Sequence, residues 1–471
     1  MRAMRRSSDL LRRAAQSVLG KQQKAAKSGP FSRGVFTSAN PLQARLCGEQ
    51  QPLKADLAFT LVGAAAAVIY LNRTTALSGP ETLEPDALEE LARDLSSSNT
   101  ADKERAVSML SSLTPYLEYH SAMLGAGVFP ALIKAVLDAR MIPQVRVIAL
   151  GCAADLLKEN DAKKAAASNP DFIPNLLNAL KSEGGWENGP EEGGIARASA
   201  ARALAELCAA PELHGTISKT GAAQALAEHG AEAAEVSKSE DKTYSSLSEV
   251  PGTMVERHAV EDERFTAAAL YNLACSSTGV TSILNAATNA VVGLGRWASS
   301  KDPILQRYGV GALSRMSTSS PRAFRAVVDS GCLPALVAAT ASDDAQAQCF
   351  AAGAIGKLVD LGEGPAQLLL EANAPSALIA MLNEGRHSAP AAIGGSSKGV
   401  QRGVQRCSVR AILSTLSSDA FCKELLAAGV LPKVQAVLNS GLNEKTDAEL
   451  INIIGQIIGN LQAERMVTRA S

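Results

Sequence analysis

Apolar residues recur from about residue 83 onward in two alternating kinds of short segment. The first kind begins with glycine, two apolar residues and proline, and then continues as an apolar helix, at 127–132, 331–336 and 429–434. A glycine there ends the preceding helix, and a proline in the first turn of the next helix lacks only an N–H that would have no partner. Weaker copies lie at 172–176, 221–226 and 374–378. The pattern predicts short helices throughout.

The second kind of segment is an alanine-rich helix between these anchors. Copies lie at 147–153, 200–207, 267–274, 310–316, 352–358 and 409–416. Pro130 and Pro174 are 44 residues apart and Pro334 and Ser376 are 42 apart, which is the period of helical repeats of the armadillo and HEAT class. Alanines let neighbouring helices approach closely, so stacked units can bury a core that no single unit could close.

The segment Ala267-Ala268-Ala269-Leu270-Tyr271-Asn272-Leu273-Ala274 resembles the third helix of armadillo repeats, and the glycine-proline anchors resemble the start of their second helix. The resemblance covers roughly 83–465, as about eight units of which several are degenerate. It implies an all-α, right-handed solenoid of armadillo/HEAT-like repeats. It also implies a non-catalytic scaffold that binds an extended segment of a partner protein in a concave groove formed by the third helices.

Peptide-binding armadillo proteins carry a ladder of asparagines along that groove. Matching the motif repeat by repeat places the ladder at Cys152, Glu206, Asn272, Arg315, Lys357 and Thr415. Only Asn272 keeps the asparagine, and Trp186 and Trp297 fall outside the pattern. The candidate groove residues are therefore Asn272, Arg315, Lys357, Glu206 and Thr415. Arg315 and Lys357 favour an acidic or phosphorylated segment, unless they are ordinary solvated side chains.

Three insertions interrupt the period, near 183–194, 233–263 and 383–403. They are rich in glycine, serine and proline or in charge, which predicts exposed loops. Trp186 lies in the first of them. It is either a binding anchor or a residue that folds back onto its own repeat.

The N-terminal 48 residues have a charge pattern of their own. Ten of the 46 basic residues and one of the 47 acidic residues lie there, among leucine, valine, serine and alanine. A basic amphipathic helix almost free of acids is typical of an import presequence. Residues 32–38 resemble the cleavage region of plant-type mitochondrial presequences, so we expect a mitochondrial protein of the green lineage, in the inner membrane or matrix. A chloroplast transit peptide and a disordered basic arm are the alternatives.

A hydrophobic segment at 55–73 follows this presequence. Its uncharged run, 57–71, would cover about 23 Å as a helix, which is short of the roughly 30 Å of a bilayer core. Tyr70 and Arg73 are residue types found at membrane interfaces. The segment is a candidate for a single membrane anchor, and a packed helix or a sorting signal is the alternative.

The rest of the chain offers no recognisable catalytic chemistry. Residues 49–471 hold 36 basic and 46 acidic residues, and this acidic balance argues against nucleic acid as a partner. The five histidines are dispersed, and no phosphate loop or metal motif is present, so we expect no cofactor and no enzyme. The carboxylates Asp86, Glu89 and Glu90 and the run at 261–263 are expected on solvated helix faces. A regulatory subunit or an enzyme assembled only by the fold is the alternative.

The eight cysteines are dispersed along the chain with no closely spaced pair. This spacing indicates neither a metal site nor a disulfide framework. We expect most of them to be small buried residues in a reducing compartment. They are Cys47, Cys152, Cys208, Cys275, Cys332, Cys349, Cys407 and Cys422.

Overall fold

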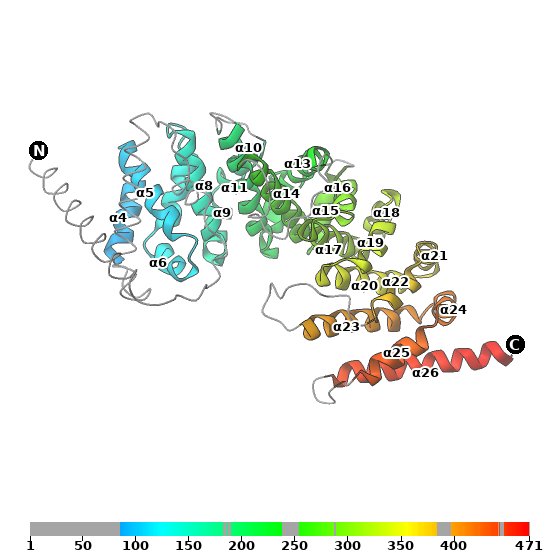
Figure 1. Ribbon diagram of the computed structural model, residues 1–471. Helices are drawn as coiled ribbons and strands as arrows, with labels where there is room; N and C mark the ends of the chain where they lie inside the picture. The colour runs from blue at the N-terminus through cyan, green and yellow to red at the C-terminus, as the bar shows by residue number, and fades with distance from the viewer. Residues whose placement is uncertain are drawn as a thin grey trace, which may run out of the picture. The chain divides into compact units, whose positions relative to one another are not determined.

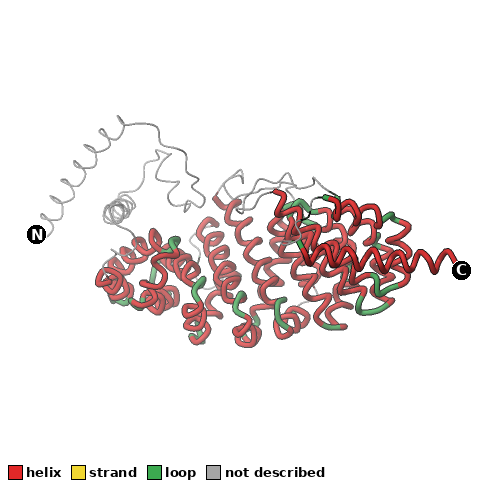
Figure 2. Tube along the Cα trace, turned by 90° about the horizontal axis from the view of Figure 1, so that it is seen from below, coloured by secondary structure: helices red, strands yellow, loops and turns green. Residues whose placement is uncertain are grey.

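The computed structural model describes residues 85–181, 186, 190–237, 254–286, 289–383, 397–440, 442 and 447–470. The chain divides into two compact units, 1–87 and 88–471. In the first unit, the structure describes only the first turn of helix α4 (Pro85–Leu95). The predicted presequence at 1–48 and the hydrophobic segment at 55–73 lie outside the described residues. Every regular element in the described ranges is a helix, and short loops join these helices (Figure 2).

The helices of the second unit recur in groups of three. The first helices of the groups are short, and their bounds are α6 (His120–Gly125), α9 (Asn160–Ser168), α12 (His214–Lys219), α15 (Ser277–Asn285), α18 (Pro321–Asp329), α21 (Glu363–Glu371) and α24 (Asp419–Ala427). The second helices are α7 (Val128–Leu137), α10 (Phe172–Leu180), α13 (Ala222–Ser237), α16 (Asn289–Ala298), α19 (Leu333–Ala338), α22 (Ala374–Ala380) and α25 (Val430–Asn439).

The third helices are the longest of each group. They are α8 (Pro143–Leu156), α11 (Pro190–Cys208), α14 (Met254–Leu273), α17 (Pro303–Ser319), α20 (Ala345–Val359), α23 (Ser397–Thr415) and α26 (Ala448–Ala470), preceded by the equivalent α5 (Thr100–Leu113). Each third helix packs against the next one in chain order, and the second helices from α7 to α22 do the same (Figure 1). Three helices per repeat is the armadillo arrangement, whereas HEAT repeats have two. The prediction of an all-α solenoid is confirmed, with seven complete groups in the described ranges where about eight were expected.

The glycine anchors end the first helices as predicted. Gly127, Gly331 and Gly429 have φ of 74°, 68° and 76°, a left-handed conformation that glycine adopts without steric cost. Gly221, in a weaker copy, has φ of 76°. Asn373 takes the same place with φ of 61°, and asparagine is the residue that best tolerates this region after glycine. The left-handed turn before the second helix is thus present even in repeats that lack the complete glycine-proline motif.

Alanine makes the core between consecutive third helices thin. Ala203, Ala269, Ala312 and Ala354 are all 0% exposed. The third helix α17 also approaches the second helix α16 closely, because a Cβ on Gly309 would lie 2.5 Å from the backbone nitrogen of Ala298. This packing leaves little room for larger side chains between neighbouring helices.

The predicted insertions are narrower than expected. Residues 190–194, 233–237, 254–263 and 397–403 are helical, as parts of α11, α13, α14 and α23. Polar and small residues misled the prediction, because several of them are buried within packed helices: His258, Asp262 and Glu263 are 4%, 5% and 5% exposed. Apart from Trp186, the central parts of the three insertions lie outside the described residues.

Within the described ranges no single helix is long and apolar enough to cross a membrane. Two pairs of consecutive helices have the required length and composition only when the two helices of each pair are counted together. In each pair a first helix is followed by a second helix, and the chain bends between them by 86° in one pair and 91° in the other. They are Leu117–Gly125 with Val128–Leu137, and Pro321–Asp329 with Leu333–Ala341.

Candidate functional site

Charged residues join consecutive third helices at a repeated position. Arg264 on α14 binds Asp302, whose carboxylate caps α17 by accepting hydrogen bonds from the N–H groups of Ile304 and Leu305 at 2.8 and 3.1 Å. The Arg264 Nη2 to Asp302 Oδ2 distance is 2.6 Å, and both side chains are about nine-tenths buried. One carboxylate therefore caps a helix and ties it to the preceding repeat.

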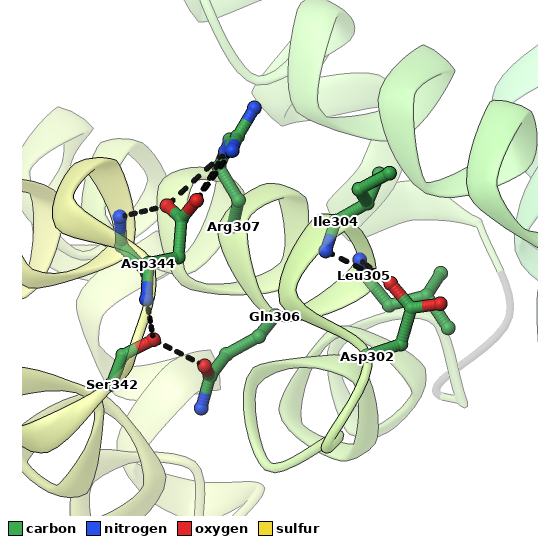
Figure 3. A network of polar contacts seen from close by, with 8 residues as sticks. Asp302, Ile304, Leu305, Gln306, Arg307, Ser342 and Asp344 are labelled. Carbon is green, nitrogen blue, oxygen red and sulfur yellow. Dashed lines mark hydrogen bonds and ion pairs between the residues drawn. The ribbon is translucent and has the colours of Figure 1, made fainter. Parts of the chain in front are cut away.

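The same arrangement recurs one repeat later. Arg307 Nε on α17 donates to both carboxylate oxygens of Asp344 at 3.1 Å, and Asp344 caps α20 through the Ala347 N–H (Figure 3). The Ser342 hydroxyl donates to the Gln306 side-chain oxygen and accepts from the Asp344 N–H. At the end of the array, Arg402 and Arg406 on α23 both bind Asp447, the residue before α26.

At the junction between α8 and α11, an arginine of α8 stacks on an aromatic ring. The Arg146 guanidinium lies 4.1 Å above the Trp186 ring centroid, and the tryptophan is 1% exposed. Of the two roles predicted for Trp186, the structure therefore supports the one in which it folds back onto the repeats. It is not an exposed binding anchor.

The acidic run at 261–263 is not a solvated helix face, which corrects the sequence-based expectation. Asp262 and Glu263 are each 5% exposed. Asp262 accepts a hydrogen bond from His229 at 2.8 Å, and Glu263 accepts one from the Trp297 indole at 2.9 Å. Both carboxylates join α14 to the second helices α13 and α16. Asp86, Glu89 and Glu90 are exposed, as expected.

Burial of the third helices corrects the register of the predicted ladder at two positions. Glu206, Asn272, Arg315 and Lys357 each reach the surface and are followed by two buried residues. In α8 the partly exposed residue that is followed by two buried residues is Asp155. Cys152, the residue predicted for this position, is only 2% exposed. The matching residue of α23 is Ser414, which lies just before the buried Thr415.

Thr415 cannot meet a ligand, because it is 0% exposed and its hydroxyl donates to the Ile412 carbonyl at 2.8 Å. The corrected ladder consists of Asp155, Glu206, Asn272, Arg315, Lys357 and Ser414. Its first members have partners within the protein. Arg202 binds Asp155 at 3.0 Å and Lys163 lies 3.7 Å from Glu206.

Asn272 also has a partner within the protein. Its amide donates to the Ala205 carbonyl on α11 at 3.0 Å. This bond uses one of the two amide hydrogens and leaves the rest of the amide at the surface. Asn272 therefore helps to join two third helices, whatever else it contacts.

An aromatic cluster of three rings and one cation lies beside Asn272. The rings of Tyr271 and Tyr308 are 5.6 Å apart, and those of Tyr271 and Phe350 are 5.7 Å apart, both within the range of favourable aromatic pairs. Arg315 lies 5.2 Å from the Tyr271 ring centre and donates to its hydroxyl at 3.2 Å. All four side chains are half-buried. Burial raises the pKa of Tyr308, so this phenol stays neutral.

Gly311 provides the space for this cluster. A Cβ at Gly311 would lie 2.6 Å from the Tyr271 ring and 3.1 Å from the Phe350 ring. The rings of three consecutive repeats can thus meet over α17 because this position has no side chain. The sequence-based reasoning named Arg315 but missed the cluster, although a glycine within an alanine-rich third helix is a signal of close approach.

Arg315 and Lys357 have no acidic partner among the described residues. Arg315 contacts Tyr271, and Lys357 is exposed. The other charged ladder residues, Asp155 and Glu206, are paired with cations of the protein. The third-helix surface from α14 to α20 therefore combines exposed aromatic area with two uncompensated positive charges.

The described histidines have structural partners. His120 and His214 begin first helices, and each Nε2 lies 2.7 Å from a carbonyl at the end of the preceding third helix. His229 is bound to Asp262, and His258 Nδ1 lies 3.3 Å from Glu261. No group of three or more histidine, cysteine, aspartate or glutamate side chains in the described ranges is arranged to hold a metal ion.

The fold and this surface define the chain as an α-solenoid of three-helix repeats. No protein-family description and no curated protein matches it. Among solved structures it is similar to a designed armadillo repeat protein, with 18% identity over 61% of this chain and 99% of that chain and a TM-score of 0.44. An engineered protein is 19% identical over 80% of this chain and 98% of that one, with a TM-score of 0.45.

A further designed armadillo repeat protein, solved in complex with the peptide (KR)4, is 18% identical. It covers 61% of this chain and 99% of its own length, with a TM-score of 0.44. At these identities the likeness concerns the fold alone.

Proposed function

We propose that this chain is a non-catalytic scaffold for protein–protein interaction, and that an extended, acidic or phosphorylated segment of a partner binds across α14, α17 and α20. The observation that supports this most directly is the pair of cations, Arg315 and Lys357, that have no acidic partner among the described residues. A carboxylate or phosphate of the partner would form charge-assisted hydrogen bonds with them.

The aromatic cluster supports the same placement of the partner. Tyr271, Tyr308 and Phe350 are rigid, half-exposed rings, and aromatic side chains with arginine are enriched where proteins bind one another. Arg315 is held in place by Tyr271 before any ligand arrives, so little side-chain entropy is lost on binding. The surface thus offers apolar area and charge side by side.

A binding assay on the full chain tests this proposal. Labelled peptides with an acidic, a phosphorylated or a basic charge pattern would be titrated with the wild type and with R315E/K357E. We expect the acidic and phosphorylated peptides to bind, and the double variant to weaken that binding by roughly tenfold or more, which is about 1.4 kcal/mol or more.

The matched control is K219E/R325E. Lys219 and Arg325 are exposed on the first helices α12 and α18 and undergo the same charge change away from the third helices. An equal loss of affinity in this control, or equal binding of the basic peptide, would refute the proposed site. The variant G311A adds a second readout, because its methyl group would displace the Tyr271 and Phe350 rings and weaken binding without a change of charge.

We further propose that residues 1–48 direct the chain to mitochondria and that residues 55–73 tether it to a membrane there. The basic, acid-poor N-terminus and the uncharged run at 57–71 support this. A fluorescent protein fused to residues 1–48 would locate the target organelle, and chloroplast accumulation would overturn the mitochondrial assignment. Release of the full chain from membranes by carbonate would overturn the tether.

A further inference from the structure

The junction between α20 and α23 differs from the arginine–aspartate junctions before it. Cys349 on α20 lies 42 residues after Arg307, and Arg307 lies 43 residues after Arg264. Cys349 thus occupies the position from which these arginines reach the aspartate of the next repeat. Its thiol instead lies next to the thiol of Cys407 on α23, close enough for each group to affect the ionisation of the other.

The α23 backbone lies close to the same thiol. Cys349 Sγ is 3.9 Å from the carbonyl oxygen of Gly403, one helical turn before Cys407 on the same face. Further along, a Cβ on Gly356 would lie 3.1 Å from the Ala411 Cα, so the two helices also approach closely beyond the thiols. The thiols therefore face each other across a tight helix–helix contact.

This pair is the one place in the described residues where two cysteines from different repeats meet. Cys349 and Cys407 are half-buried and so remain within reach of small solutes. Cys152, Cys208, Cys332 and Cys422 are buried, and burial raises the pKa of Cys152 to about 12. Cys275 is exposed, and its thiol donates a hydrogen bond to the Tyr271 carbonyl at 3.5 Å.

We propose that Cys349 and Cys407 form an oxidisable dithiol, which a low-molecular-weight disulfide such as glutathione disulfide converts into an intramolecular disulfide between consecutive repeats. One thiolate attacks the glutathione disulfide, forms a mixed disulfide and releases one glutathione thiolate. The second protein thiolate then attacks the protein sulfur of the mixed disulfide and releases the second glutathione. Two protein thiols are oxidised, and one glutathione disulfide is reduced to two glutathione molecules.

The environment assigns the first attack to Cys407. Arg410 lies three residues after Cys407 on α23, on the same side of the helix. The contact with the Cys349 thiol and the positive charge of Arg410 lower the pKa of Cys407, whereas the contact with Cys407 raises the pKa of Cys349. Once Cys407 is in the mixed disulfide, it carries no negative charge, so the cause that kept Cys349 protonated is removed. Cys349 is then the resolving thiol.

The disulfide would join residues 58 positions apart and fix α20 against α23. A cross-link over such a loop restricts the unfolded chain and stabilises the folded one. The oxidised array would therefore resist separation of these two repeats, which the reduced array holds by packing.

The test uses the full chain, purified under reducing conditions and equilibrated with glutathione buffers of increasing disulfide content. After alkylation, intact mass gives the number of free thiols, and peptide mapping without reduction gives the linkage. We expect the wild type to lose two free thiols, to yield a Cys349–Cys407 linked peptide without retained glutathione, and to unfold at a higher temperature.

Single variants separate the two roles. C349S is expected to retain glutathione on Cys407, and C407S to react more slowly than the wild type. The control C275S should form the same linkage as the wild type. Retained glutathione on both cysteines, a linkage between other cysteines, or unreacted Cys349 and Cys407 in samples where Cys275 is modified would each overturn the proposal.

Discussion

The α8–α11 and α14–α17 junctions perform the same task with different chemistry. In both, an arginine from one third helix reaches a residue that lies just before the next one. Arg146 stacks on the Trp186 ring at 4.1 Å, whereas Arg264 forms an ion pair with Asp302 at 2.6 Å. A guanidinium suits both uses because it is planar, always charged and weakly hydrated. In both repeats an arginine of one third helix thus reaches the segment before the next third helix, but the partner differs.

The largest effect is expected from removing the stacked partner. Trp186 is 1% exposed, so W186A would leave a large cavity at the α8–α11 junction and strip the ring from Arg146. We expect a loss of about 3–5 kcal/mol in the free energy of unfolding, measured by urea denaturation. W186F, which keeps an aromatic face, should lose less. Equal stability of W186A and the wild type would mean that this junction does not depend on the ring.

A smaller loss is expected from neutralising the ion pair. In D302N the asparagine still caps α17, but the buried Arg264 guanidinium loses the charge of its partner. We expect a loss of about 1.5–3 kcal/mol, and little change of this loss in high salt because the pair is screened from solvent.

The control for D302N is E449Q. Glu449 pairs with Arg410, and their side chains are 65% and 57% exposed. Surface pairs of this kind contribute about 0–1 kcal/mol, so E449Q should be close to the wild type in the same urea titration. A loss as large as that of D302N would contradict the distinction between buried and exposed pairs.

The smallest effect concerns Asp138, which follows α7 and forms an ion pair with Lys103 on α5 at 2.7 Å, and it depends on pH. Hydrogen bonds from Arg140 and Lys103 hold the pKa of Asp138 well below its ordinary value of 3.8. A carboxyl with a lowered folded-state pKa stabilises the fold at pH values above 3.8, and that stabilisation is lost as the pH falls below it. D138N should therefore be less stable than the wild type at pH 7, and the difference should shrink in acid. A difference that stays constant down to pH 2 would show that Asp138 contributes through packing alone.

Much of the fold could be predicted from local signals. The anchor glycines have left-handed backbone, and the alanine-rich segments are third helices, because both features act within a few residues of the chain. The register of those helices was harder to predict. In α8, alanine, glycine and cysteine are similar in size, so the sequence around Cys152 does not show that Asp155 is the residue at the surface.

The contacts between repeats could not be predicted, because they join distant parts of the chain. Asp262 and Glu263 look like a solvated acidic run until His229 and Trp297 are placed beside them. The aromatic cluster likewise needs three successive repeats, 271, 308 and 350, to be stacked in the correct register. Arg315 was found because the repeat motif places it at a ladder position, whereas its ring partners have no local signal.

The three predicted insertions share one place in the repeat. They follow the second helices α10, α13 and α22 and precede the third helices α11, α14 and α23. The flanking helices are held by their neighbours in the stack, and each doubling of a connecting segment costs only about 0.6 kcal/mol. Chain length can therefore change there during evolution without rebuilding the array. The same positions suit the grafting of a reporter domain.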